Sequence, residues 1–204
     1  MSDEIAALRA ELADLKARVQ VNEDYRELCN LQAAYGYYVD KSMWDEAADL
    51  FAKDGTLEIA ARGLYRGLDR IRAYLHRLPK LEHGRVFNHM QLQPVIHVAE
   101  DGESAEGRWR TIMEVGLPEV SLRGEGTYEN LYVREDGVWK IARLHAFITY
   151  YVPAGAGWDE GGVPMAAEIP DFPPDAPQTI AYGSFPEVFV PPFHYANPVT
   201  GRRR

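Results

Sequence analysis

The apolar positions in the first twenty residues follow a helical repeat. Between residues 3 and 21 they are spaced alternately three and four apart and flanked by charges, which predicts an amphipathic helix with a short heptad seam made of Ile5, Leu8, Leu12, Leu15 and Val19. A seam of little more than two heptads is too short to hold two helices together alone. We therefore expect this segment to dock on its own domain or on a neighbouring subunit.

Three more apolar stripes predict helices that face a common core. The first begins near Asn22 or Asp24, each of which is a candidate N-cap. Ser42, with Asp45 three positions later, predicts a capping box at the start of the second, and the third covers residues 68–78. The predicted core positions are Tyr25, Leu28, Leu31, Tyr35, Tyr38, Trp44, Ala47, Ala48, Phe51, Ile71, Tyr74, Leu75 and Leu78.

From Phe87 onward the apolar period changes from 3.6 to 2, which is typical of strands. Asp136-Gly137 predicts a tight hairpin turn, because both residues tolerate a positive φ. Helices followed by consecutive antiparallel strands indicate an α+β fold with the helices on one face of a curved sheet. The predicted strands are residues 56–61, 87–98, 107–115, 126–135 and 137–152.

The last predicted strand is apolar on both faces. Ile141 and Phe147 lie on one face by simple alternation, and Leu144, Ala146 and Ile148 lie on the other. An antiparallel strand with two apolar faces indicates a subunit interface on the side of the sheet away from the helices. We therefore expect a homodimer or a homotrimer.

The chain changes character once more after Val152. Ten of its 13 prolines lie between Pro153 and Pro198, with no helical or strand period. Disordered tails are poor in aromatic residues, whereas this segment holds Trp158, Phe172, Tyr182, Phe185, Phe189, Phe193 and Tyr195. We favour an extended arm that wraps the domain over a disordered tail. The expected regions are an N-terminal helix (1–21), a central domain (22–152) and a C-terminal arm (153–204).

Composition and charge limit the classes of partner that we expect for this protein and indicate where in the cell it acts. The net charge of −9 argues against nucleic acid or an anionic membrane as the main partner. No apolar run approaches the length of a membrane span, and the acidic N-terminus has no apolar stretch typical of a secretory signal. The single cysteine, Cys29, excludes an internal disulfide and fits a buried small residue better than a nucleophile. We expect a cytoplasmic protein.

The sequence lacks the spacing patterns of common metal and cofactor sites. Its six histidines are scattered, there is no cysteine pair, and no phosphate-binding glycine loop or serine-hydrolase motif is present. We expect no metal and no cofactor, although a metal site assembled from His, Asp and Glu on separate strands is not detectable by spacing. Acid–base chemistry by side chains alone remains.

Asp40 and His89 are the candidates for such chemistry. Asp40 lies at the C-terminal end of a predicted helix, where the helix dipole disfavours an acid by up to ~1 kcal/mol. His89 shares the polar side of its strand with Gln91 and His97, so the alternative is a solvated or interface histidine. Pro94 marks a candidate bulge, which would let the two halves of the strand face differently.

Several motifs resemble one known family. The spacing YxxxxDxxxWDE from Tyr35, then NHM, GRW and above all YVREDGVWKIARL, are similar to the SnoaL-like branch of the nuclear-transport-factor-2-like cone fold, over residues 22–152. Within it the likeness is nearest to bile-acid 7α-dehydratase and hexachlorocyclohexane dehydrochlorinase, and more distant to scytalone dehydratase. The resemblance implies a cone-shaped curved antiparallel sheet packed on N-terminal helices, here with an extra N-terminal helix and a C-terminal arm.

The resemblance also implies roles for individual residues. Asp40 and His89 match the His–Asp pair of those lyases, and Tyr35 matches the catalytic tyrosine of the bile-acid enzyme. Tyr38, Trp44, Trp109, Met113 and Phe147 are the residues that we expect to line the substrate pocket with Tyr35. The chain departs from its likenesses where Met113 and Ile148 replace an Asp and an Arg of the bile-acid enzyme, and where Ala61 and Trp109 replace a tyrosine and a histidine of scytalone dehydratase.

The predicted function is that of a cofactor-independent lyase. His89 would be the general base, Asp40 its orienting partner and Tyr35 a hydrogen-bond donor or acid. Dehydration, dehydrohalogenation and retro-aldol loss of formaldehyde need the same parts, and the substrate would be a hydrophobic aromatic or polycyclic small molecule. The alternatives are a ketosteroid-type isomerase and a non-catalytic small-molecule carrier.

Overall fold

Residues 2–40 form one helix rather than two. The computed structural model describes residues 2–157, 160 and 162–203, and in it α1 runs from Ser2 to Asp40 without a break. The predicted cap at Asn22 or Asp24 is therefore wrong. Asn22 donates to the Arg18 carbonyl within the helix, and Asp24 is buried and accepts a bond from the Trp139 indole. Both side chains are satisfied without a new helix start.

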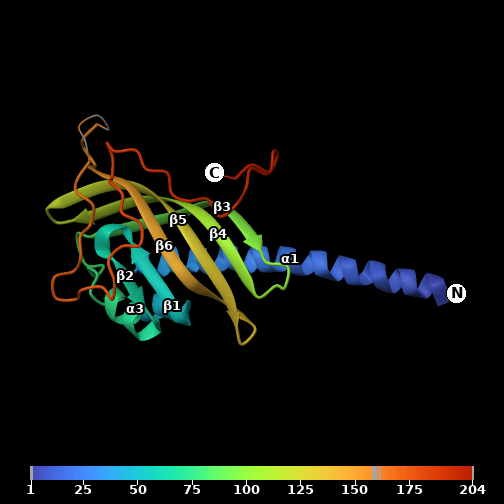
Figure 1. Ribbon diagram of the computed structural model, residues 1–204. Helices are drawn as coiled ribbons and strands as arrows, with labels where there is room; N and C mark the ends of the chain where they lie inside the picture. The colour runs from blue at the N-terminus through green and yellow to red at the C-terminus, as the bar shows by residue number, and fades with distance from the viewer. Residues whose placement is uncertain (1, 158–159, 161, 204) are drawn as a thin grey trace.

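The N-terminal half of α1 extends beyond the sheet, whereas its C-terminal half lies along the domain (Figure 1). At ~1.5 Å per residue the whole helix is about 58 Å long. The five seam residues, from Ile5 to Val19, are 48% to 64% exposed in the single chain. The seam therefore finds no partner in its own domain, and docking on another subunit stays a prediction.

The next two helices are shorter than predicted, whereas the first strand is longer. The predicted capping box is wrong, because Ser42 has φ 54° and its Oγ accepts the Leu81 N–H at 2.7 Å. Helix α2 (Trp44–Asp49) starts after Met43, and Phe51 opens a strand instead of closing the helix. The elements in order are β1 (Phe51–Ile59), a 3₁₀ turn η1 (Ala60–Arg62), β2 (Leu64–Arg66) and α3 (Leu68–Leu75).

Four long strands complete a curved six-stranded sheet. They are β3 (Val86–Val98), β4 (Ser104–Leu117), β5 (Val120–Glu135) and β6 (Val138–Pro153), in the spatial order β2-β1-β6-β5-β4-β3. Only the β1–β6 pair is parallel among the strand pairs of the described chain. Asp136 and Gly137 have φ of 51° and 78°, which confirms the predicted hairpin turn. The architecture is α+β, as predicted.

Bulges decide which side chains face the helices. In β3 the register shifts between Leu92 and Val95, with Gln93 at φ 49°. His89 consequently faces α1 while His97 faces the opposite side of the sheet, so the bulge predicted at Pro94 is confirmed. A second shift pairs Tyr132 with Ile141 but Leu131 with Arg143. It returns Ile141 to the core with Leu144, and our grouping of Ile141 with Phe147 was wrong.

The C-terminal arm covers the side of the sheet that the helices leave open. Phe147 of β6 is 2% exposed and packs against the rings of Tyr182 and Phe189, with centroids 5.7 and 5.6 Å away. The Ile148 N–H donates to the Tyr182 hydroxyl at 2.8 Å. The arm of the same chain thus shields the second face of β6 from solvent. Trp158, which we also expected in the arm, lies outside the described residues.

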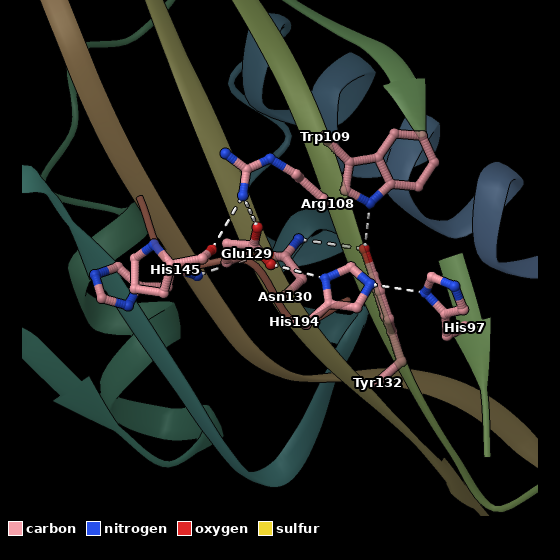
Figure 2. Close-up of polar contacts among 9 residues, drawn as sticks. His97, Arg108, Trp109, Glu129, Asn130, Tyr132, His145 and His194 are labelled. Carbon is pink, nitrogen blue, oxygen red and sulfur yellow. Dashed lines mark hydrogen bonds and ion pairs between the residues drawn. The ribbon is translucent and has the colours of Figure 1, made fainter. Parts of the chain in front are cut away.

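A polar cluster fixes the end of the arm to the same face (Figure 2). Glu129 of β5 accepts bonds from Arg108 of β4 and from His194 Nδ1, the latter at 2.9 Å. The guanidinium of Arg108 also lies 3.8 Å from the ring centroid of Phe193. His194 Nε2 meets His97 Nδ1 at 3.1 Å. Residues near 193 are therefore held by three strands of the sheet.

Candidate active site

Asp40, the last residue of α1, meets His89 near the start of β3. Asp40 Oδ1 accepts the His89 backbone N–H at 2.9 Å and lies 2.8 Å from His89 Nδ1. Asp40 is 8% exposed. The tautomer with its proton on Nδ1 can donate to this carboxylate, and in that neutral tautomer Nε2 keeps a free lone pair. The contact that the resemblance predicts is present.

These bonds account for an acid at the C-terminal end of a helix. The dipole of α1 disfavours the charge there by up to ~1 kcal/mol. Two N–H donors from His89 face the same carboxylate oxygen, and each bond to a charged group contributes about 1.5–3 kcal/mol. The bonds outweigh the dipole, so β3 rather than α1 decides that Asp40 is tolerated.

His89 also lines a cavity of about 280 Å³ between the sheet and the helices. Most of its wall is aliphatic or aromatic, and residues of the arm, Val163, Pro164 and Ala166, form part of it. The polar side chains in the wall are those of Tyr35, Arg62, His89, Tyr128 and Tyr151. None of the described lining residues is acidic. Asp40 instead lines a separate groove between α1 and the edge strand β3, which His89 shares.

The structure brings some predicted pocket residues together and separates others. Tyr35, Trp44 and Met113 line the cavity with His89. Tyr38 does not, because Val39, one turn after Tyr35 on α1, takes the lining position while Tyr38 packs at the margin of the core.

Trp109 was also predicted to line the pocket, and the structure corrects this. It faces the helices, as Met113 does, but four residues earlier in β4, beyond the end of the cavity. There its indole N–H donates to the Tyr132 hydroxyl at 2.8 Å, in a buried polar network with Gln32 (Figure 2 shows Trp109 and Tyr132). Trp109 is a core residue rather than a lining residue.

Phe147 is the third correction, because it faces away from the cavity. Its ring stacks on His145 with the centroids 3.9 Å apart, on the side of the sheet that the arm covers. Alternation along β6 places Ile148, the next residue, in the cavity wall instead. The strand was predicted correctly, but the face of the sheet on which Phe147 lies was not.

Tyr35 presents a protonated hydroxyl to the cavity. Its side chain is 3% exposed, and its hydroxyl makes no hydrogen bond to any other residue that the structure describes. Burial, reinforced by the neighbouring Tyr128, raises the pKa of Tyr35 well above its ordinary value. Burial also raises the pKa of Tyr128. Both phenols therefore remain hydrogen-bond donors at neutral pH.

Three polar residues of the cavity wall were not predicted from the sequence: Arg62, Tyr128 and Tyr151. Arg62 ends the turn η1 after β1, and its Nη1 donates to the Tyr74 hydroxyl at 2.7 Å. The Tyr151 hydroxyl contacts Met113 Sδ at 3.1 Å. The inward alternation of β5 gave a signal for Tyr128, but no local pattern marks a lone arginine in a connection as a cavity residue.

The structure gives no sign of two other kinds of site. No group of His, Cys, Asp and Glu side chains suited to a metal ion occurs among the described residues. None of the helices in that part of the chain is both long and apolar enough to cross a bilayer.

Comparison with known proteins agrees with the geometry. The model of the SnoaL-like domain family matches residues 20–145, more than half of the chain. The chain belongs to the SnoaL-like family. The curved sheet and the N-terminal helices are thus those of a SnoaL-like domain. Comparison with curated proteins gives no match.

Solved structures with the same fold include three that bear on this SnoaL-like domain. A scytalone-dehydratase-like protein of Novosphingobium aromaticivorans is 18% identical, with 75% of this chain and 97% of that chain covered and a TM-score of 0.61. A hexachlorocyclohexane dehydrochlorinase, LinA type 2, is 21% identical, covering 68% and 95% with a TM-score of 0.61. An NTF2-like protein with a cystatin-like fold from N. aromaticivorans is 19% identical, covering 73% and 94% with a TM-score of 0.59. Likeness at this identity shows the fold alone.

Proposed function

We propose that this protein is a cofactor-independent lyase that removes a proton from a small hydrophobic, aromatic substrate and expels a leaving group from the adjacent carbon. The observation that carries the proposal is the 2.8 Å contact between Asp40 Oδ1 and His89 Nδ1, at the wall of an apolar cavity. A binding pocket alone has no need for a buried carboxylate that fixes the tautomer of a lining histidine.

In the proposed reaction His89 Nε2 accepts the substrate proton. The electron pair of the broken C–H bond forms the new double bond, and the bond to the leaving group breaks with its electrons. Asp40 holds the ring and stabilises the imidazolium that forms. His89 then returns its proton to solvent or to the departing group, which leaves the enzyme unchanged.

Tyr35 is suited to the developing negative charge. Its hydroxyl stays protonated and has no hydrogen-bond partner among the described residues, so it is free to donate to a substrate oxygen. A donor that is already oriented in a water-poor cavity stabilises an oxyanion without reorganisation in the transition state. We assign Tyr35 this role on either a carbonyl that becomes an enolate or a departing oxygen.

The cavity limits the size of the substrate. Its volume of about 280 Å³ lies at the lower end of the ~300–1,000 Å³ typical of small-molecule sites. One or two aromatic rings fit this volume better than a four-ring skeleton does. The proposal therefore moves from a polycyclic substrate toward a smaller aryl compound.

A β-hydroxy aryl ketone offers a direct test, because its activated C–H and its hydroxyl allow more than one outcome. Incubation in deuterated water detects proton abstraction by mass spectrometry, even without a leaving group. Loss of water gives the enone, whereas loss of formaldehyde gives the shorter ketone. Product analysis thus separates dehydration from retro-aldol cleavage.

We expect His89→Gln and Asp40→Asn to lower the exchange or elimination rate by about a hundredfold or more, the usual contribution of a positioned general base. His83→Gln is the matched control, since His83 is exposed, and it should leave the rate unchanged. Circular dichroism would confirm that the variants fold. Ligand binding with no deuterium uptake on any aryl ketone would favour a carrier instead. Full activity in His89→Gln would rule out His89 as the general base.

A further inference from the structure

The cavity wall contains a cation without a carboxylate partner. Arg62 lines the cavity and donates to the neutral hydroxyl of Tyr74 at 2.7 Å, while its charge also interacts with Tyr151 and Tyr65. No ion pair links Arg62 to an acidic side chain anywhere in residues 2–157, 160 and 162–203. By contrast, the partly buried Arg108 and Arg134 each contact a buried carboxylate, Glu129 and Asp24.

Arg62 is only partly exposed, and a guanidinium that is removed from bulk water is costly unless another group compensates its charge. Buried charges in proteins are normally paired, because taking an ion out of water costs several kcal/mol even after relaxation. One hydroxyl occupies only one of the five N–H donors of an arginine. The described residues of the cavity lining include tyrosine hydroxyls but no carboxylate that could pair with the remaining donors.

Trp44 provides a second, independent sign of a missing acceptor. It lines the same cavity and is 4% exposed, yet its indole N–H has no hydrogen-bond partner among the described residues. Buried indole N–H groups usually find an acceptor. Arg62 and Tyr35 thus offer two kinds of donor to the cavity, and the buried Trp44 N–H beside it is a third donor without an acceptor among the described residues. The described lining offers no anionic acceptor.

We propose that Arg62 binds an ionised oxygen group of the ligand, a carboxylate or a phenolate carried by an aromatic ring. The inference deepens the proposed function, since it concerns the same cavity and adds the charge of its substrate. Planar guanidinium groups favour such oxygens because they present paired donors.

The sheet order places Arg62 and His89 at opposite margins of the site. Arg62 follows β1, His89 lies on β3, and strands β6, β5 and β4 separate the two. A ligand anchored by its anionic group at Arg62 therefore points its other end toward His89. The position of the reactive carbon is then set by the distance between anion and leaving group, so Arg62 selects substrates by length as well as charge.

Calorimetric titration with a naphthoate and the matching naphthamide tests the inference without turnover. The two probes have nearly the same shape, and only the first is ionised at neutral pH. We expect the wild-type protein to bind the naphthoate at least about tenfold more tightly, as a charge-assisted hydrogen bond allows. Arg62→Met should abolish this preference and leave naphthamide binding unchanged, while Arg62→Lys should retain part of it.

Equal affinity of the wild type for the two probes would overturn the inference, and so would a preference that survives in Arg62→Met. The wild-type comparison holds even if the Met variant fails to fold. His89→Gln separates this inference from the proposed function. A variant that loses proton abstraction but keeps the naphthoate preference supports both, whereas a preference without any deuterium exchange in the wild type supports the anion site alone.

Discussion

Gln32 is the residue whose replacement should show most clearly that the core and the site depend on one another. It is fully buried in α1. Its Oε1 accepts from Asn130 Nδ2 at 2.9 Å and from the Tyr132 hydroxyl at 2.8 Å, and its Nε2 donates to Gln91 Oε1 at 3.1 Å. Gln91 in turn donates to the His89 carbonyl at 3.1 Å.

The cost of Gln32→Leu follows from the groups that it leaves behind. Asn130 Nδ2 still contacts the Tyr132 hydroxyl at 3.2 Å. The Tyr132 O–H and the Gln91 Oε1 lose their partners, at about 1–3 kcal/mol for each unsatisfied group. The added leucine recovers roughly 1 kcal/mol by apolar burial. We expect a loss of about 3 kcal/mol in the free energy of unfolding, or a Tm roughly 6–12 °C lower for a chain of this size.

Urea unfolding followed by tryptophan fluorescence measures this change. Asn30→Leu is the matched control, since it adds the same side chain two residues away at an exposed position and should stay within about 0.5 kcal/mol of the wild type. We also expect Gln32→Leu to slow proton abstraction, because Gln91 no longer holds the β3 backbone at His89. A loss below about 1 kcal/mol would refute the network as a source of stability.

Three further predictions concern pH, the arm and assembly. Burial, with help from Arg143, lowers the pKa of His145 below its ordinary value of about 6.5, although Glu58 opposes the shift. The unfolded chain then binds the extra proton, so the free energy of unfolding falls as pH drops below about 6.5. His145→Gln should flatten this slope in urea titrations. Phe189→Ala should lower the free energy of unfolding by about 1–2 kcal/mol and speed amide exchange in the arm, because the ring packs on Phe147. Val188→Ala is the control and should change neither quantity, since this side chain is 93% exposed. Replacing Leu8 and Leu12 with glutamate should lower the association state in sedimentation runs; a wild-type monomer of 23.1 kDa would contradict assembly through the seam.

The local sequence pattern was sufficient to predict most of the strands. Long alternating runs and the Asp136-Gly137 turn identify β3 to β6, because those signals depend on neighbouring residues only. The break near Asn22 and Asp24 was wrong for the opposite reason. A cap-forming side chain looks the same whether it bonds its own helix or a distant strand, and Asp24 bonds Arg134 and Trp139.

The residues of the candidate site were predicted where the family resemblance identified their positions. They were missed where the role of a residue depends on the face of the sheet that it occupies or on its contact partners. Asp40 stood out by its place at a helix end, but only the resemblance paired it with His89. Alternation alone placed His89 with His97, and the bulge after Leu92 separates them. Phe147 was assigned to the wrong face. Arg62 is notable because the described residues include no carboxylate that pairs with it. The spacing of residues along a sequence cannot reveal that a contact is missing.

The arm has a consequence for how this sequence can drift over evolutionary time. An outer sheet face that meets water tolerates almost any polar residue, whereas Phe147 and its neighbours must match Tyr182 and Phe189, more than thirty positions away in the chain. Substitutions on either side are therefore tied to each other. A lineage that sheds the arm regains a freely mutable face, and descendants of such a loss would be expected to carry a polar residue where Phe147 now stands.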